Sequence, residues 1–294
     1  MLSKLSKSEI KVLALLCKKG LSIKELSVGL DVKPSFLFRV LSSLSSKMLV
    51  SVAKRGITKY IGLSQASHAQ NFKRLFESRP NVNFGMLISG SAMNILIILG
   101  KGADMDMIMR EANCSKTTLY KILYNLSSAG LLRRDKERIE LSDPLLNLFA
   151  ESYADNMQLI LQKGLSVSNS VRIRNHVIIR TDAKTVPEFF SETGITALSK
   201  EGFEANLTSY QDFYFSLNER KTEIGLEESL IHAVALTAAQ QHQDMPALSL
   251  FFAKNASRFD IRALRKLAKD YSVEDELNEI RQKAEFYEKM RGFE

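Results

Sequence analysis

The sequence predicts a mainly α-helical protein with small β-hairpins: two similar N-terminal units followed by a mixed α and β domain. Three observations predict this class. Part of the chain repeats at an offset of 82 residues, each copy ends in a hairpin pattern, and the composition changes after residue 165. At 294 residues the chain exceeds one small core, and 45% apolar with 25% charged residues is ordinary for a globular protein. We expect domains over residues 1–65, 90–165 and 166–294, with a helical linker over residues 66–89.

The repeat aligns residues 13–50 with residues 95–132 without a gap, and apolar positions match through most of its length. In each copy, a first helix of about a dozen residues ends near a glycine. A shorter helix then follows a capping residue, Ser22 or Asp104. After a turn a third helix begins, and Pro34 suits its first position. The sequence therefore predicts the same arrangement of helix, turn and helix twice.

The third helix of each copy has an apolar side and a polar side. In the first copy the apolar residues recur at spacings of three, one and three: Leu37, Val40, Leu41 and Leu44. We expect this side to pack on the first two helices and the other side to face solvent. The outer side carries Ser35, Arg39, Ser42 and Ser46, which align with Thr117, Lys121, Tyr124 and Ser128. In a DNA major groove, Arg can pair with guanine, and hydroxyls can reach bases or phosphates.

A hairpin pattern follows each third helix. Residues 48–61 and 130–141 each contain two short apolar stretches around a charged tip, which favours a β-hairpin. With SKTTLYKILYNLSSAGLLRRD leading into the second hairpin, the chain resembles the winged helix-turn-helix transcription regulators of the MarR and ArsR type. The resemblance covers residues 8–64 and 90–142. This fold also serves as a protein-interaction module.

The resemblance implies that the third helix enters the major groove and that the hairpin, or wing, contacts the DNA backbone. The candidate DNA-binding residues are Lys33, Ser35, Arg39, Ser42, Lys54, Arg55, Lys59, Lys116, Thr117, Lys121, Arg133 and Arg134. We expect the first unit to bind more strongly, because acids that repel phosphate interrupt the second wing: Asp135, Glu137 and Glu140. The second unit could instead pack or dimerise.

Charge is concentrated at the N-terminus. Lys and Arg exceed Asp and Glu by nine over residues 1–65 and by two over residues 66–165, whereas residues 166–294 carry a net charge of −3. Such a distribution favours binding to a polyanion, and we expect double-stranded DNA as the partner.

No unbroken apolar stretch indicates a signal peptide or membrane span, so we expect a cytoplasmic protein without membrane contact. The two cysteines and four histidines lack metal-ligand spacing, and we expect no metal or cofactor.

Gly90-Ser91 followed by Asp104 and Asp106 is similar to the pattern of nucleotidyltransferases, in which paired acids hold Mg²⁺. The repeat instead places Asp104 at a helix start, so we interpret it as a cap and expect no enzyme.

After residue 165, strand-like segments precede several helices, which predicts an α+β domain. EESLIHAVAL, FFAKN and DIRALRKLAKDY are similar to abortive-infection antitoxins. This likeness leaves open an antitoxin-like or protein-interaction module that also binds its own promoter. A homodimer or partner protein could use the helix expected over residues 144–163 or the C-terminal domain. His232 is interpreted as a core residue.

Overall fold

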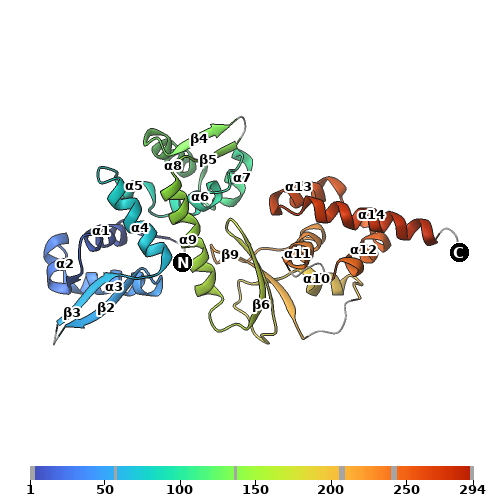
Figure 1. The fold of residues 1–294 in the computed structure, drawn as a ribbon, viewed down its shortest axis with the longest axis horizontal. Coiled ribbons are helices and arrows are strands. Elements are labelled where there is room, and N and C mark those ends of the chain that lie inside the picture. Colours follow the sequence, from blue (N-terminus) through green and yellow to red (C-terminus); the bar gives the residue numbers. More distant parts are fainter. Residues whose placement is uncertain (1–3, 56–57, 136–137, 205–208, 240–243, 292–294) are drawn as a thin grey trace. The chain divides into compact units, whose positions relative to one another are not determined.

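The computed structural model describes residues 4–55, 58–135, 138–204, 209–239 and 244–291. The chain divides into two compact units, Met1–Leu161 and Gln162–Glu294, each considered by itself below. Within the described residues the protein is mainly helical, with three small antiparallel sheets (Figure 1). The expected class of a mainly α protein with small β elements is confirmed at this level.

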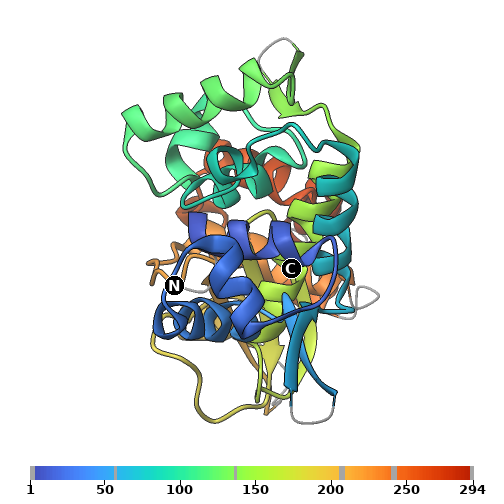
Figure 2. The same ribbon diagram turned by 90° about the vertical axis from the view of Figure 1, so that its left-hand side faces the viewer.

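The first unit opens with a repeat of four helices and a small sheet, called here the first repeat. Its elements are α1 (Lys7–Leu16), β1 (Leu21–Ser22), α2 (Ile23–Leu30), α3 (Pro34–Ser46), β2 (Val50–Arg55), β3 (Thr58–Leu63) and α4 (Ser67–Ser78). Ser22 caps α2 in a capping box with Glu25, and Pro34 occupies the first turn of α3. The three strands form an antiparallel sheet in the order β1-β3-β2. In Figure 2 this repeat faces the viewer in blue.

The second repeat follows a short helix, α5 (Phe84–Leu87), and has the same order of elements. These are α6 (Ala92–Leu99), α7 (Met105–Glu111), α8 (Lys116–Ser128), β4 (Leu132–Asp135), β5 (Arg138–Leu141) and α9 (Pro144–Leu161). The similarity extends to a detail of pairing, because Ala103 bridges Ile139 of β5 where Leu21 of the first repeat pairs with Ile61 of β3. Each hairpin is followed by a helix, so α9 is the counterpart of α4.

Helices α4 and α9 pack against each other and join the two repeats. Phe72 of α4 is fully buried, with its ring centroid 5.5 Å from that of Phe149 on α9. An amide hydrogen bond from Asn71 to the hydroxyl of Ser152 crosses the same contact over 3.0 Å. Within the first unit α9 buries its apolar residues Leu146, Phe149, Ala150, Tyr153, Ala154 and Met157, while Leu148 and Leu159 are exposed.

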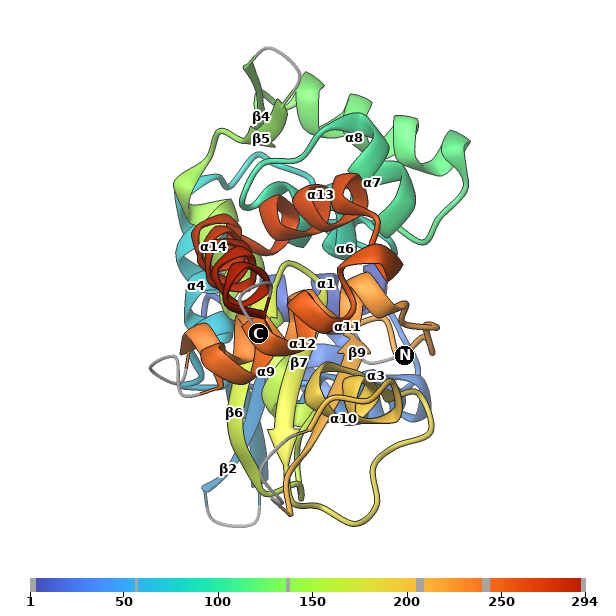
Figure 3. The same ribbon diagram turned by 90° about the vertical axis from the view of Figure 1, so that its right-hand side faces the viewer.

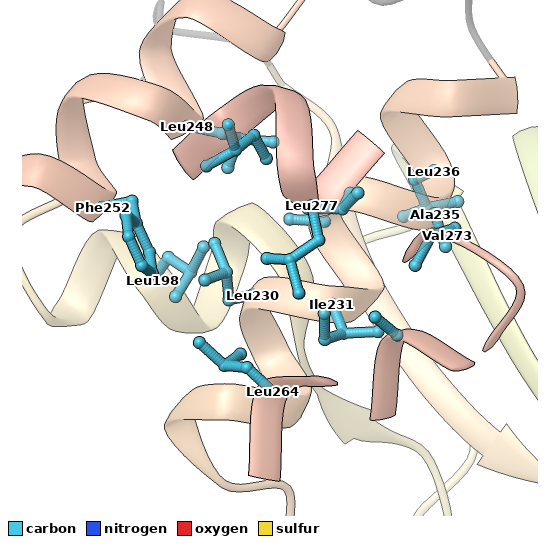
Figure 4. Close-up of a cluster of buried hydrophobic side chains, with 14 of the residues drawn as sticks. Leu198, Leu230, Ile231, Ala235, Leu236, Leu248, Phe252, Leu264, Val273 and Leu277 are labelled. Carbon is cyan, nitrogen blue, oxygen red and sulfur yellow. The ribbon is translucent and has the colours of Figure 1, made fainter. Parts of the chain in front are cut away.

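The second unit is built on a four-stranded antiparallel sheet in the order β6-β7-β9-β8. The strands are β6 (Val167–Ile173), β7 (His176–Thr181), β8 (Ser191–Glu192) and β9 (Gln211–Ser216). The helices are α10 (Gly194–Lys200), α11 (Leu226–Ala239), α12 (Met245–Lys254), α13 (Ile261–Tyr271) and α14 (Glu274–Arg291), with a 3-10 turn at Ala256–Arg258. Figure 3 shows these helices gathered around α11. Residues of all five helices share one apolar core, in which Leu230 and Ile231 of α11 are fully buried (Figure 4).

A buried polar network lies beside this core. His232 is fully buried, its Nδ1 lies 2.7 Å from the Thr193 hydroxyl, and its Nε2 lies 2.7 Å from the Tyr271 hydroxyl. Burial, reinforced by the nearby His176, lowers the pKa of His232 to about 3. The interpretation of His232 as a core residue is thus confirmed. Close by, the Arg180 guanidinium donates a 2.7 Å hydrogen bond to the buried carboxylate of Asp212.

Candidate nucleic-acid interface

Helix α3 presents a polar, acid-free face to solvent. The predicted packing side is buried at Leu37, Val40, Leu41 and Leu44, and the predicted outer side is exposed at Lys33, Ser35, Arg39 and Ser42. None of the thirteen residues of α3 is acidic. The Arg39 guanidinium lies 5.9 Å from the ring centroid of Phe36, a contact that leaves its donors available to a ligand. This face can therefore donate hydrogen bonds and attract anions.

The turn before α3 is fixed by local hydrogen bonds. Asp31 ends α2 with a left-handed backbone, φ 52°, and the Ser27 hydroxyl donates to the carbonyl of Val32 over 2.5 Å. The second repeat shares the left-handed residue, because Asn113 adopts φ 47° at the matching position. Short polar side chains such as Asp and Asn tolerate this conformation better than other non-glycine residues. The angle between the second and third helix is thereby set locally in both repeats.

The far end of α3 is anchored by Lys47. Its buried ammonium donates to Glu9 of α1 over 2.5 Å and to the carbonyl of Lys4 over 2.7 Å. Its own carbonyl lies 2.9 Å from Nε2 of His68 on α4 and accepts from the amide of Asn156 on α9 at 3.0 Å. Burial alone raises the pKa of Glu9, but the hydrogen bonds from Lys47, Ser6 and Ser43 outweigh it and leave the pKa lowered. Glu9 therefore stays ionised and holds the cation.

The first hairpin places like charges opposite each other. Lys54 of β2 pairs across the strands with Lys59 of β3, and both are exposed. Neither lysine has a carboxylate partner among the described residues. Arg55 lies opposite Thr58 in the register, but its side chain is outside the described residues. Directly opposed like charges destabilise a strand pair. An external anion bound between the two ammonium groups would therefore stabilise the hairpin.

In the second hairpin, arginines lie opposite acidic residues. Arg133 donates through Nε to Glu140 over 2.6 Å, and Asp135 of β4 pairs in register with Arg138 of β5. Arg134 remains exposed, and Glu137 is outside the described residues. On α8, Lys116, Thr117 and Lys121 are exposed as predicted. The two repeats therefore share a helical face but differ in the charge that their hairpins offer.

Exposed aromatic side chains on the third helices were missing from the predicted site. Phe38 is 57% exposed, and its counterpart Tyr120 is 47% exposed. Tyr124, which the sequence placed on the outer side of α8 without a role, is 71% exposed. The helical spacing of the buried leucines already excluded Phe38 from the core, so that signal was present in the sequence.

The other candidate chemistry has structural explanations. Asp104 caps α7 and accepts a 2.8 Å hydrogen bond from the Met107 amide, which confirms the capping interpretation. Within the described ranges, His, Cys, Asp and Glu form no group of three suited to a metal ion. Among the helices that the structure describes, none has the length and apolarity needed to cross a bilayer.

Comparisons with known proteins add no relative. Family models, curated proteins and solved structures were all searched, and none matches this chain.

Proposed function

We propose that the chain is a transcription regulator that binds double-stranded DNA through the first repeat, acting as a winged helix-turn-helix. In this proposal α3 lies in the major groove and the β2–β3 hairpin contacts the phosphate backbone. The observation that carries the proposal is the combination of an acid-free exposed helix with the opposed pair Lys54 and Lys59 on the adjoining hairpin.

The reasoning is electrostatic and geometric. An α-helix with its side chains fits the major groove, and Arg39, Ser35 and Ser42 supply the donors that read base edges or hold phosphates. Lys54 and Lys59 repel each other in the free protein. A phosphate between them would relieve the repulsion and release counterions from the DNA. Binding would thus be favoured both by relief of the repulsion in the protein and by release of counterions from the DNA.

Fluorescence anisotropy of a labelled duplex across a range of salt concentrations tests the proposal. Affinity should fall steeply as salt rises. The double variant Lys54→Gln with Lys59→Gln should lower the slope of log affinity against log salt by roughly 0.9 for each lost phosphate contact. Arg39→Gln should weaken binding by roughly tenfold if it pairs with a base.

The matched control is the double variant Lys7→Gln with Lys11→Gln, which removes two exposed cations of α1 outside the proposed interface. It should leave the slope and affinity close to those of the wild type. An equal loss in the control and in the hairpin variant would show that only overall charge matters. The proposal of a defined interface would then be wrong.

A further inference from the structure

The second repeat carries an open groove between α8 and its hairpin. Its volume is about 400 Å³, and its walls include Tyr120, Leu123 and Tyr124 of α8 and Leu132, Arg134 and Ile139 of the hairpin. The groove lining contains no acidic residue. The buried residues of its lining, Leu123 and Ile139, are aliphatic, whereas two tyrosines and Arg134 are exposed.

The two tyrosines lie one helical turn apart and expose much of their surface. Tyr120 is 47% and Tyr124 is 71% exposed, although large aromatic residues usually gain free energy from burial. Residues four apart on a helix are neighbours, so the two rings border the same stretch of groove. Two exposed rings at this spacing offer flat surfaces on which planar groups can stack.

Cations surround this aromatic surface. Lys116 lies with its ammonium 5.9 Å from the ring centroid of Tyr120, and Lys121 and Arg134 are exposed. Helix α8 carries no acid in its thirteen residues. The acids of the adjoining hairpin that the structure describes are opposed by arginines, Glu140 by Arg133 and Asp135 by Arg138. The local charge is therefore suited to an anionic partner with flat rings.

The first repeat lacks this combination. The position of Tyr124 is held there by Ser42, a small hydroxyl suited to close approach to a base pair. The first hairpin also offers the opposed Lys54 and Lys59, whereas the second hairpin opposes cations with acids. The same scaffold thus presents a phosphate-binding hairpin in one copy and a stacking surface in the other.

We propose that the α8 groove binds single-stranded nucleic acid, with bases stacked on Tyr120 and Tyr124 and phosphates held by Lys121 and Arg134. Stacking on aromatic side chains combined with cationic contacts is how proteins bind single strands without strong sequence preference. An acidic peptide would satisfy the cations but would leave both exposed rings without a planar partner. The inference is separate from duplex binding by the first repeat, because it involves other residues of another copy.

Anisotropy of a short labelled oligothymidylate at low salt tests the inference on the full chain. The chain itself supplies the test substitution, since Tyr124→Ser installs the residue of the first repeat at a position that is 71% exposed. Tyr124→Ser should weaken oligothymidylate binding by roughly tenfold, the effect of one lost stacked base. Tyr124→Phe keeps the ring and should stay within about twofold of the wild type.

Two further measurements distinguish this site from the first repeat. Tyr124→Ser should leave duplex affinity unchanged, and the double variant Lys54→Gln with Lys59→Gln should retain oligothymidylate binding. The inference is overturned if the wild type does not bind oligothymidylate or if Tyr124→Ser binds it as well as the wild type. It is equally overturned if the wild type binds a polyglutamate peptide rather than oligothymidylate and Tyr124→Ser abolishes that peptide binding. An absence of duplex binding would contradict the proposed function but not this site.

Discussion

Lys47 is the residue through which the first repeat holds its third helix in place. Its ammonium and carbonyl contact α1, α4, α9 and the segment before α1. Its side chain and that of Glu9 are each only 4% exposed, so neither charge is compensated by water. Removing one partner of such a pair leaves the other charge buried without compensation.

Lys47→Met should therefore destabilise the protein by about 3–5 kcal/mol. The substitution keeps the backbone carbonyl bonded to His68 and Asn156, so the loss reports the missing ammonium and the Glu9 carboxylate left buried without it. Chemical denaturation measures this change in the free energy of unfolding. In contrast, Lys73→Met, which removes an exposed pair with Glu77, should cost about 0–1 kcal/mol. Adding Glu9→Gln to Lys47→Met should restore part of the loss, and a double variant weaker than Lys47→Met would contradict this explanation.

His232 gives the second unit a defined pH dependence. Its pKa is about 3 when folded against an ordinary value of 6.5, so below 6.5 the unfolded chain binds the proton first. The stability that neutral His232 contributes is fully present above 6.5 and is lost as the pH falls towards 3. The expected slope reaches about 1.4 kcal/mol per pH unit. His232→Gln should flatten this slope in denaturation curves of the full chain, and an unchanged slope would assign the acid sensitivity to other groups.

At the scale of elements, the two hairpins share a topology and differ in the charges of their cross-strand pairs. Helix starts were predictable because capping is local: Ser22, Asp104 and Pro34 stand where they were expected. The buried face of α9 was not predictable. Apolar side chains occur on several sides of this helix, and the choice among them depends on the rings of α4. That contact joins residues far apart in the sequence, which no local pattern indicates.

Under the proposed binding of nucleic acid, the paired charges of the second hairpin predict how a phosphate contact can be added there. Glu140→Gln removes the acceptor that holds Arg133 and should free this guanidinium for phosphate. The salt dependence of nucleic-acid binding should steepen by up to about 0.9 in log–log slope. Stability should change by less than about 1 kcal/mol because the pair is exposed. A steeper slope together with marked unfolding in denaturation experiments would indicate a structural role for the pair instead.

At the scale of the whole molecule, the repeat was visible in the sequence because it preserves the spacing of apolar residues. The positions of the candidate residues on outer helical faces followed from the same spacing. The contact that joins the repeats could not be predicted from this spacing, because α4 and α9 lie outside the ungapped match. The second hairpin is shorter than the first, so the helices that follow the two hairpins no longer align at the same offset. The aromatic contact between them makes the two repeats parts of one compact unit.

This shared core predicts that the two repeats lose stability together. Phe72 is fully buried and its ring packs near those of Phe76, Phe84 and Phe149. Phe72→Ala should cost about 3–5 kcal/mol through lost burial and the cavity left behind. Hydrogen exchange read by mass spectrometry should show faster exchange in peptides of α3 and α8 alike, although Phe72 belongs to the first repeat. Peptides of α11, in the other compact unit, serve as the internal control and should exchange as in the wild type. Loss of protection in α3 alone would mean that the repeats unfold independently and that the α4–α9 contact does not couple them.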